Sequence, residues 1–133
     1  MMPRALLEGS AEGELLVLEA PLSFWGGVDA ATGDIIDGRH PQAGANLAGR
    51  VLVMPHGKGS SSASSVLAEC LRLGTGPCAI VLDHSDEILL AGALVARELY
   101  GVTCPIVVVP AIAPLESGRR YRVDARGVTE VDA

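Results

Sequence analysis

The sequence predicts an α/β domain with a mostly parallel central layer and extra β-structure at its margins. Short apolar runs at 51–54, 79–82 and 105–109 are typical of strands buried on both faces. Two segments with helical periodicity separate these runs, which predicts two strand–helix–strand crossovers. Alternating apolar and polar residues near both ends predict flanking β-hairpins.

The amino-acid composition indicates how many domains the chain forms, which residues build its core and which classes of partner are disfavoured. We expect the 133 residues to form one domain, 1–133, and the 49% hydrophobic content is enough for a sizeable core. Only 3% of the residues are aromatic, so this core must consist of Val, Leu, Ile and Ala. The net charge of −6 argues against nucleic acid or an anionic membrane as a partner. A small anionic substrate would need local attraction, for example from the only lysine, Lys58.

The N-terminal part is predicted to begin with a hairpin. Segments 4–8 and 14–19 have strand character, and the glycine-containing segment 9–13 would connect them. A long irregular stretch, 21–49, follows, with a short strand expected at 35–36. Irregular loops of this length are uncommon inside compact domains and are usually functional.

The first crossover starts at the strand 51–54 and continues into a helix that ends near Leu73. Ser61 or Ser62 is the expected N-cap of this helix, and Gly74 stops it.

The second crossover follows the strand 79–82 and contains a helix at 87–100. Ser85 or Asp86 is its expected N-cap, and Gly101 ends it. Arg97 is expected to point to solvent. The apolar residues at helical spacing are Ile88, Ala91, Val95 and Leu99, flanked by Leu90 and Leu94.

The chain is predicted to close with a hairpin made of 119–124 and 128–132, joined near 125–127. Arginines gather on this hairpin, which favours a solvated strand edge that discourages pairing with other chains. A binding patch is the alternative. The arginines are Arg119, Arg120, Arg122 and Arg126.

The cysteines predict neither a disulfide framework nor a metal site. Cys70, Cys78 and Cys104 are odd in number, and no pair has C-x-x-C spacing. They fit small buried residues in a reducing cytoplasm. No signal peptide is recognisable, and no apolar run approaches the roughly 20 residues that span a bilayer.

The most informative stretch is the glycine–serine loop, 57–65, between the first buried strand and the first helix. Glycines let a ligand approach the backbone, and the first turn of a helix presents free N–H groups to an anion. The loop matches no Walker, dinucleotide or nucleophile-elbow pattern. The simple alternative is a serine-rich N-cap, although one cap needs one hydroxyl and the loop has five serines. The candidate substrate-binding residues here are Gly57, Lys58, Gly59 and Ser62.

A second stretch, 21–29, holds the only phenylalanine and the only tryptophan, Phe24 and Trp25. Both aromatics could pack a corner of the core. The alternative is a loop that lines a pocket or docks on another chain, which makes Trp25 and Gly26 candidate binding residues.

The three histidines show no metal-binding spacing. His56 flanks the glycine–serine loop and is a candidate for a hydrogen bond to an anion. His40 precedes Pro41 and suits a turn, and His84 precedes the expected cap of the second helix.

Several segments taken together resemble the small subunit, or swivelling domain, of the aconitase X dehydratases. They follow the family's order from about 9 to 109, most of the chain. The segments are 22–29 with Thr32-Gly33 and Ile36-Asp37, His40-Pro41 with Gly44, 57–62, and 92–96. The resemblance implies a swivelling β/β/α fold and a cytoplasmic location. It also implies a larger partner subunit that carries an iron–sulfur cluster, with no cofactor bound by this chain alone.

The resemblance also implies a role for the serines. In related aconitases a Gly-Ser-Ser element supplies the base that removes a proton beside a carboxylate. Carried over by position, this base is Ser60 or Ser61, with Ser62 as a third option. Aconitases continue with an arginine where this chain has Ser62, so the resemblance does not extend to aconitase's own substrate.

Two substrates are known within the family. Bacterial two-subunit members resemble cis-3-hydroxy-L-proline dehydratases, and archaeal members resemble mevalonate 5-phosphate dehydratases. The serine run 60–62 and the helix end 97–101 favour hydroxyproline, which would yield Δ1-pyrroline-2-carboxylate. The phosphorylated substrate is the alternative, and a non-catalytic module for anion binding or assembly is a third possibility.

Overall fold

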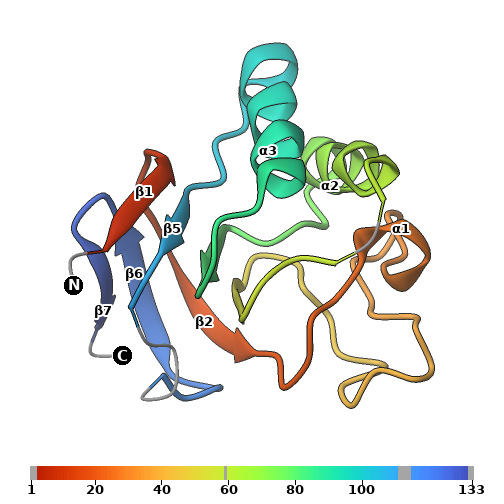
Figure 1. Cartoon of the computed structure of the whole chain (residues 1–133), viewed down its shortest axis with the longest axis horizontal. Helices are drawn as coiled ribbons and strands as arrows, with labels where there is room; N and C mark the ends of the chain where they lie inside the picture. The colour runs from red at the N-terminus through yellow and green to blue at the C-terminus, as the bar shows by residue number, and fades with distance from the viewer. Residues whose placement is uncertain (1–2, 59, 111–114, 132–133) are drawn as a thin grey trace.

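A computed structural model describes residues 3–58, 60–110 and 115–131. They form one curled sheet with the strand order β1-β5-β4-β3-β2-β6-β7, and α2 and α3 lie together on one face of its central strands (Figure 1). The strands are β1 (Arg4–Leu7), β2 (Ala11–Val17), β3 (Val51–Met54), β4 (Ala79–Leu82), β5 (Ile106–Val108), β6 (Arg120–Asp124) and β7 (Gly127–Glu130). The helices are α1 (Phe24–Gly27), α2 (Ser62–Leu73) and α3 (Glu87–Tyr100).

The central strands β2, β3, β4 and β5 are parallel, and β1 and β6 pair with their outer edges in antiparallel fashion. All residues of β3 and β4 are buried, as expected for strands covered on both faces. The predicted α/β class with two crossovers through α2 and α3 is confirmed.

The predicted N-terminal hairpin is wrong. The residues 11–14 of β2 pair with β6, and 15–17 pair with β3, so both edges of β2 are occupied. β1 instead pairs with β5 at the opposite side of the sheet. The strand expected at 35–36 is reduced to isolated bridges, one of which joins Ile35 to Val28. The C-terminal hairpin of β6 and β7 is confirmed.

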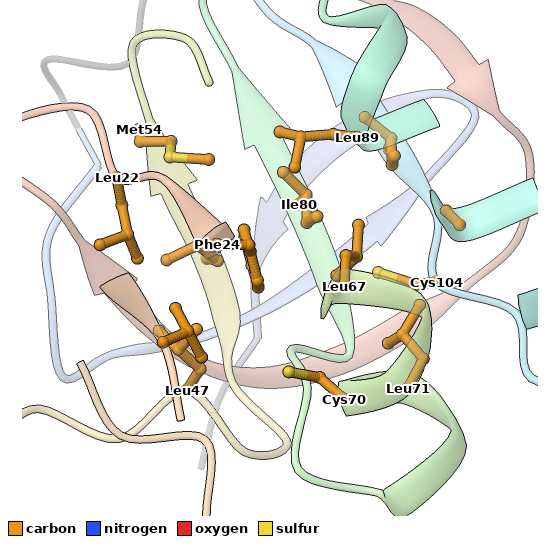
Figure 2. Packing of buried hydrophobic residues seen from close by; sticks show 14 of the residues in the cluster. Leu22, Phe24, Leu47, Met54, Leu67, Cys70, Leu71, Ile80, Leu89 and Cys104 are labelled. Atoms are coloured by element: carbon orange, nitrogen blue, oxygen red, sulfur yellow. The ribbon is translucent and has the colours of Figure 1, made fainter. Parts of the chain in front are cut away.

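Hydrophobic side chains fill both faces of the central strands. On the helical face, Ile80 from β4 packs among Leu67 of α2 and Leu89 of α3 (Figure 2). On the other face, Val53 of β3 and Val123 of β6 belong to a second cluster. The curl of the sheet at β2 brings the β6–β7 hairpin over this second face, which completes an almost entirely aliphatic core.

The buried face of α3 differs from the one its large apolar residues predict. Val95 is 42% exposed and Leu99 is 69% exposed. The inward stripe consists of Leu89, Gly92, Ala93 and Ala96. Small residues make up most of this stripe because α3 lies close against α2. Ile88, Leu90 and Leu94 are partly buried at the edge of the core, whereas Val95 and Leu99 are exposed. The predicted exposure of Arg97 is confirmed.

The ends of α3 follow the prediction. Asp86 is the N-cap, and its Oδ1 accepts a hydrogen bond from the Leu89 N–H at 2.9 Å. Gly101 ends the helix with a positive φ of 68°. In the described part of the chain, no helix is long and apolar enough to cross a bilayer.

The three cysteines are free thiols, and burial raises the pKa of each one. Cys70 and Cys104 are buried, whereas Cys78 is half-buried. The effect is largest for Cys104, whose surroundings remove all contact with water.

Stability should therefore fall at alkaline pH. The contribution of Cys104 is complete below its ordinary pKa of 9.0 and is lost above it, because the unfolded thiol ionises while the buried thiol stays protonated. We expect the free energy of unfolding to drop by about 1.4 kcal/mol per pH unit from this thiol. Urea unfolding across that range should give a shallower pH slope for Cys104→Ala than for the wild type. Equal slopes would contradict the expectation.

Candidate functional site

The loops after β2, β3 and β4 meet at the carboxyl edge of the parallel strands. The Leu18 N–H donates to the Val53 carbonyl at 2.8 Å. The Asp83 and His84 N–H groups both donate to the Pro55 carbonyl, at 2.9 and 3.0 Å. Ligands of open α/β sheets commonly bind at this edge. The glycine–serine loop lies here, beside α1 (Figure 1).

The serines lead directly into α2 without acting as its side-chain cap. Ser61 occupies the predicted N-cap position, but its φ and ψ of −58° and −22° are already helical and its side chain makes no capping hydrogen bond. Backbone groups close the turn instead. The Ser60 carbonyl accepts from the Ala63 N–H at 3.0 Å, and the Ser61 carbonyl accepts from the Ser64 N–H at 3.1 Å and from its hydroxyl at 2.7 Å.

The hydroxyl groups of Ser60, Ser61 and Ser62 are therefore not used to cap α2. All three residues are exposed. Within residues 3–58, 60–110 and 115–131, none of these hydroxyls has a hydrogen-bond partner. Because backbone carbonyls, and not these hydroxyls, accept from the Ala63 and Ser64 N–H groups, a simple capping role does not account for the serine run. Gly59 lies outside the described residues.

Gly57 is needed for close packing against α3. A methyl group at Gly57 would overlap Oδ2 of Asp86 and would lie 3.2 Å from Cδ1 of Leu89. Because Asp86 is fixed as the N-cap of α3, it cannot easily give way. A cavity of about 240 Å³ lies at this junction, lined by Gly57, Lys58, Ala63, Asp86, Ile88 and Leu89. Sequence reasoning treated Asp86 only as a helix cap.

The adjacent aromatics Phe24 and Trp25 have different environments. Core packing, the first interpretation from sequence, holds for Phe24, and the pocket-lining interpretation holds for Trp25. Phe24 is 1% exposed and packs in the core, whereas Trp25 is 61% exposed. α1 is little more than a turn, because Trp25 has an extended ψ of 112° and Gly26 has a positive φ of 78°. Trp25 and Gly26 line a cleft of about 410 Å³, which we call the Trp25 cleft.

Charged residues from two separate loops complete the Trp25 cleft. Lys58 reaches it from the glycine–serine loop, while Asp37 and Arg39 come from the long irregular stretch. Sequence reasoning missed Arg39 and gave Asp37 no role of its own. The only available signal was the pair of opposite charges around Gly38, in a loop already flagged by its length.

Hydrogen bonds from His40 and Gln42 hold this loop in place. The His40 Nε2 donates to the Ala20 carbonyl at 3.0 Å, and its Nδ1 accepts from the Gln42 N–H at 3.0 Å. The Gln42 side chain donates to the Val17 carbonyl at 2.5 Å and accepts from the Glu19 N–H at 2.8 Å. The structure thus gives His40 the turn-forming role that the sequence indicates.

The remaining candidates lie apart from the two clefts. His56 donates through Nδ1 to the Gly57 carbonyl at 2.7 Å and packs edge-to-face near His84. Arg119 pairs with Glu116 and Glu130 on the exposed hairpin, and this supports a solvated edge over a binding patch.

The described residues do not fit an iron–sulfur cluster. Among them, no group of three or more His, Cys, Asp or Glu side chains could hold a metal ion. Clusters are held by thiolates, whereas burial raises the pKa of the Cys70, Cys78 and Cys104 thiols and so disfavours the thiolate form.

Comparison with known proteins extends the resemblance. A family model described as the aconitase X swivel domain matches residues 1–131. The crystal structure of Thermococcus kodakaraensis aconitase X in its holo-form matches with a TM-score of 0.88 and 33% identity, over 98% of this chain and 97% of that one. This match confirms the predicted fold.

Two kinds of curated relatives are similar in sequence. The cis-3-hydroxy-L-proline dehydratase of Pseudomonas aeruginosa is 51% identical over 80% of this chain. This chain covers only 18% of that protein, roughly a fifth of its length. The phosphomevalonate dehydratase small subunit of Pyrococcus furiosus is 41% identical over 98% of this chain and 93% of its own length.

Proposed function

Because this chain belongs to the aconitase X swivel-domain family, we propose that it is the small subunit of a two-subunit hydro-lyase that removes water from a β-hydroxy acid. The near-complete overlap with the Pyrococcus furiosus small subunit supports a separate large partner. One observation carries the catalytic role. The Ser60 and Ser61 hydroxyls are exposed and not used for capping, at the start of α2 and close in sequence to Lys58.

In the proposed reaction, Ser60 acts as the base, with Ser61 as the alternative. Its alkoxide takes the proton from the carbon beside the substrate carboxylate and becomes a hydroxyl. The electron pair of that C–H bond forms the new C=C bond, and the C–O bond on the neighbouring carbon breaks with its electron pair going to oxygen. The departing hydroxide takes up a proton and leaves as water, and loss of the serine proton restores the alkoxide. The positive end of the α2 dipole and the ammonium of Lys58 would stabilise the alkoxide.

The iron–sulfur cluster is assigned to the large subunit, because the described residues of this chain offer no ligand set. An iron site there would supply a Lewis acid for the departing hydroxyl group. A cytoplasmic location and one swivel domain over 1–133 belong to the same proposal.

The substrate we favour is cis-3-hydroxy-L-proline. Its dehydration gives a cyclic enamine acid that rearranges to Δ1-pyrroline-2-carboxylate. The 51% identity to the Pseudomonas aeruginosa dehydratase supports this choice. The 41% identity to the phosphomevalonate dehydratase small subunit keeps mevalonate 5-phosphate as the alternative.

Co-expression with an aconitase X-type large subunit, without oxygen, tests this function. The purified complex should remove one water molecule from one of the two substrates, as measured by mass spectrometry of the product. Each subunit alone is the control and should be inactive. A well-assembled complex that dehydrates neither compound would overturn the proposal and favour a non-catalytic module.

A further inference from the structure

We propose that the Trp25 cleft binds both charged groups of a zwitterionic amino acid, with Arg39 and Asp37 as the specificity-determining residues. Arg39, assisted by Lys58, would hold the substrate carboxylate, and Asp37 would hold its ammonium group. This inference rests on the proposed function and adds a structural basis for the choice of substrate.

The position of the cleft suits an α-amino acid. Lys58 lines both this cleft and the cavity next to Gly57. Consecutive Cα atoms are about 3.8 Å apart, so the Cα of Ser60 lies within about 7.6 Å of that of Lys58. In an α-amino acid, the carboxylate, the nitrogen and the C–H bond to be broken share one carbon. Holding the first two groups in the cleft therefore brings the reacting carbon close to the serines.

The charges that line the cleft match a zwitterion. Arg39 and Lys58 are cationic, whereas Asp37 is anionic. A guanidinium binds a carboxylate through paired hydrogen bonds, and a carboxylate is the natural partner of a secondary ammonium. A substrate with a phosphate and a carboxylate would instead meet a like charge at Asp37, which disfavours it.

The two specificity residues are held in place by the loop itself. Oδ1 of Asp37 accepts from the Arg39 N–H at 3.0 Å, and the Asp37 carbonyl accepts from the His40 N–H at 3.0 Å. His40 is tied in turn to the Ala20 carbonyl. This arrangement presents both side chains on an ordered turn at the cleft, as a binding site requires.

Two substitutions test the inference in the assembled enzyme. Arg39→Gln should raise the KM for cis-3-hydroxy-L-proline and the inhibition constant of L-proline by at least about 10-fold, with little change in kcat, because it removes a charge-assisted hydrogen bond. Asp37→Asn keeps an oxygen that can accept from the Arg39 N–H but removes the charge. It should weaken L-proline binding and strengthen inhibition by mevalonate 5-phosphate. The matched control is Arg126→Gln, on the exposed β6–β7 turn, which should behave as the wild type.

The outcomes separate this inference from the proposed function. If the wild type dehydrates hydroxyproline but both variants bind L-proline as Arg126→Gln does, the cleft assignment is wrong and the proposed function stands. If the complex dehydrates only mevalonate 5-phosphate, the zwitterion selectivity is wrong. If it dehydrates neither compound, the proposed function fails first and this inference fails with it.

Discussion

Replacing Ser60 with alanine is expected to lower the kcat of the assembled enzyme by about 1,000-fold, because a positioned base contributes roughly 10²–10⁴ to such a reaction. The fold should survive. Ser60 is exposed, and its carbonyl, which accepts from the Ala63 N–H, is unchanged in the variant. KM should change little, because the hydroxyl acts mainly in the transition state.

Exchange of the substrate's α-hydrogen gives a more direct measurement. In deuterated water, NMR should show that the wild-type complex incorporates deuterium at the carbon beside the carboxylate, whereas Ser60→Ala does not. Ser61→Ala and Ser62→Ala are measured in parallel, since both residues are also exposed and the comparison identifies which serine is the base. Near-normal turnover in Ser60→Ala with a large loss in Ser61→Ala would move the base to Ser61.

Alanine at Gly92 is expected to lower the free energy of unfolding by about 2 kcal/mol. The added methyl group would lie 2.6 Å from the Ser64 carbonyl oxygen and 3.2 Å from Cβ of Leu67. A backbone oxygen cannot rotate away, so α2 and α3 must separate, at a cost near or above the upper end of the usual 1–3 kcal/mol. That cost outweighs the roughly 1 kcal/mol that alanine gains over glycine inside a helix.

The same substitution should also reduce turnover. Ser64 donates to the Ser61 carbonyl through both its N–H and its hydroxyl, so a shift of Ser64 moves the serine loop. Gly38→Ala is the matched control for stability, because nothing lies within 4 Å of the position its methyl group would take. Urea unfolding of both variants provides the comparison. Equal stability of the two would refute the close-packing argument.

Local signals were enough to predict the central elements. The bounds of β3, β4 and α3 coincide with the predicted segments, because apolar runs, an acidic N-cap and terminal glycines act within a few residues. The pairing of the strands could not be predicted in this way, because it joins segments that lie far apart in the sequence. β2 pairs with β6, more than a hundred residues away, and no alternation within β2 could reveal that partner.

Local sequence signals also failed to predict how α3 packs and which residues of the long loop line the cleft. Large apolar residues suggested the wrong face of α3, because a close helix pair selects small residues such as Gly92 and Ala93 for its interface. The serine loop could be identified from its own composition. Arg39 could not, because the hydrogen bonds that carry it to the cleft join the turn at His40 to the end of β2.

The Pro55 carbonyl, which accepts two hydrogen bonds, links two of the loops that form the site. The Pro55 carbonyl receives two N–H groups, from Asp83 and His84, so the connection after β3 and the connection after β4 are fastened at one point. The segment that leads to the serines and the segment that starts α3 are therefore tied together at a single backbone oxygen. A displacement of either segment must break these two hydrogen bonds or carry the other segment with it.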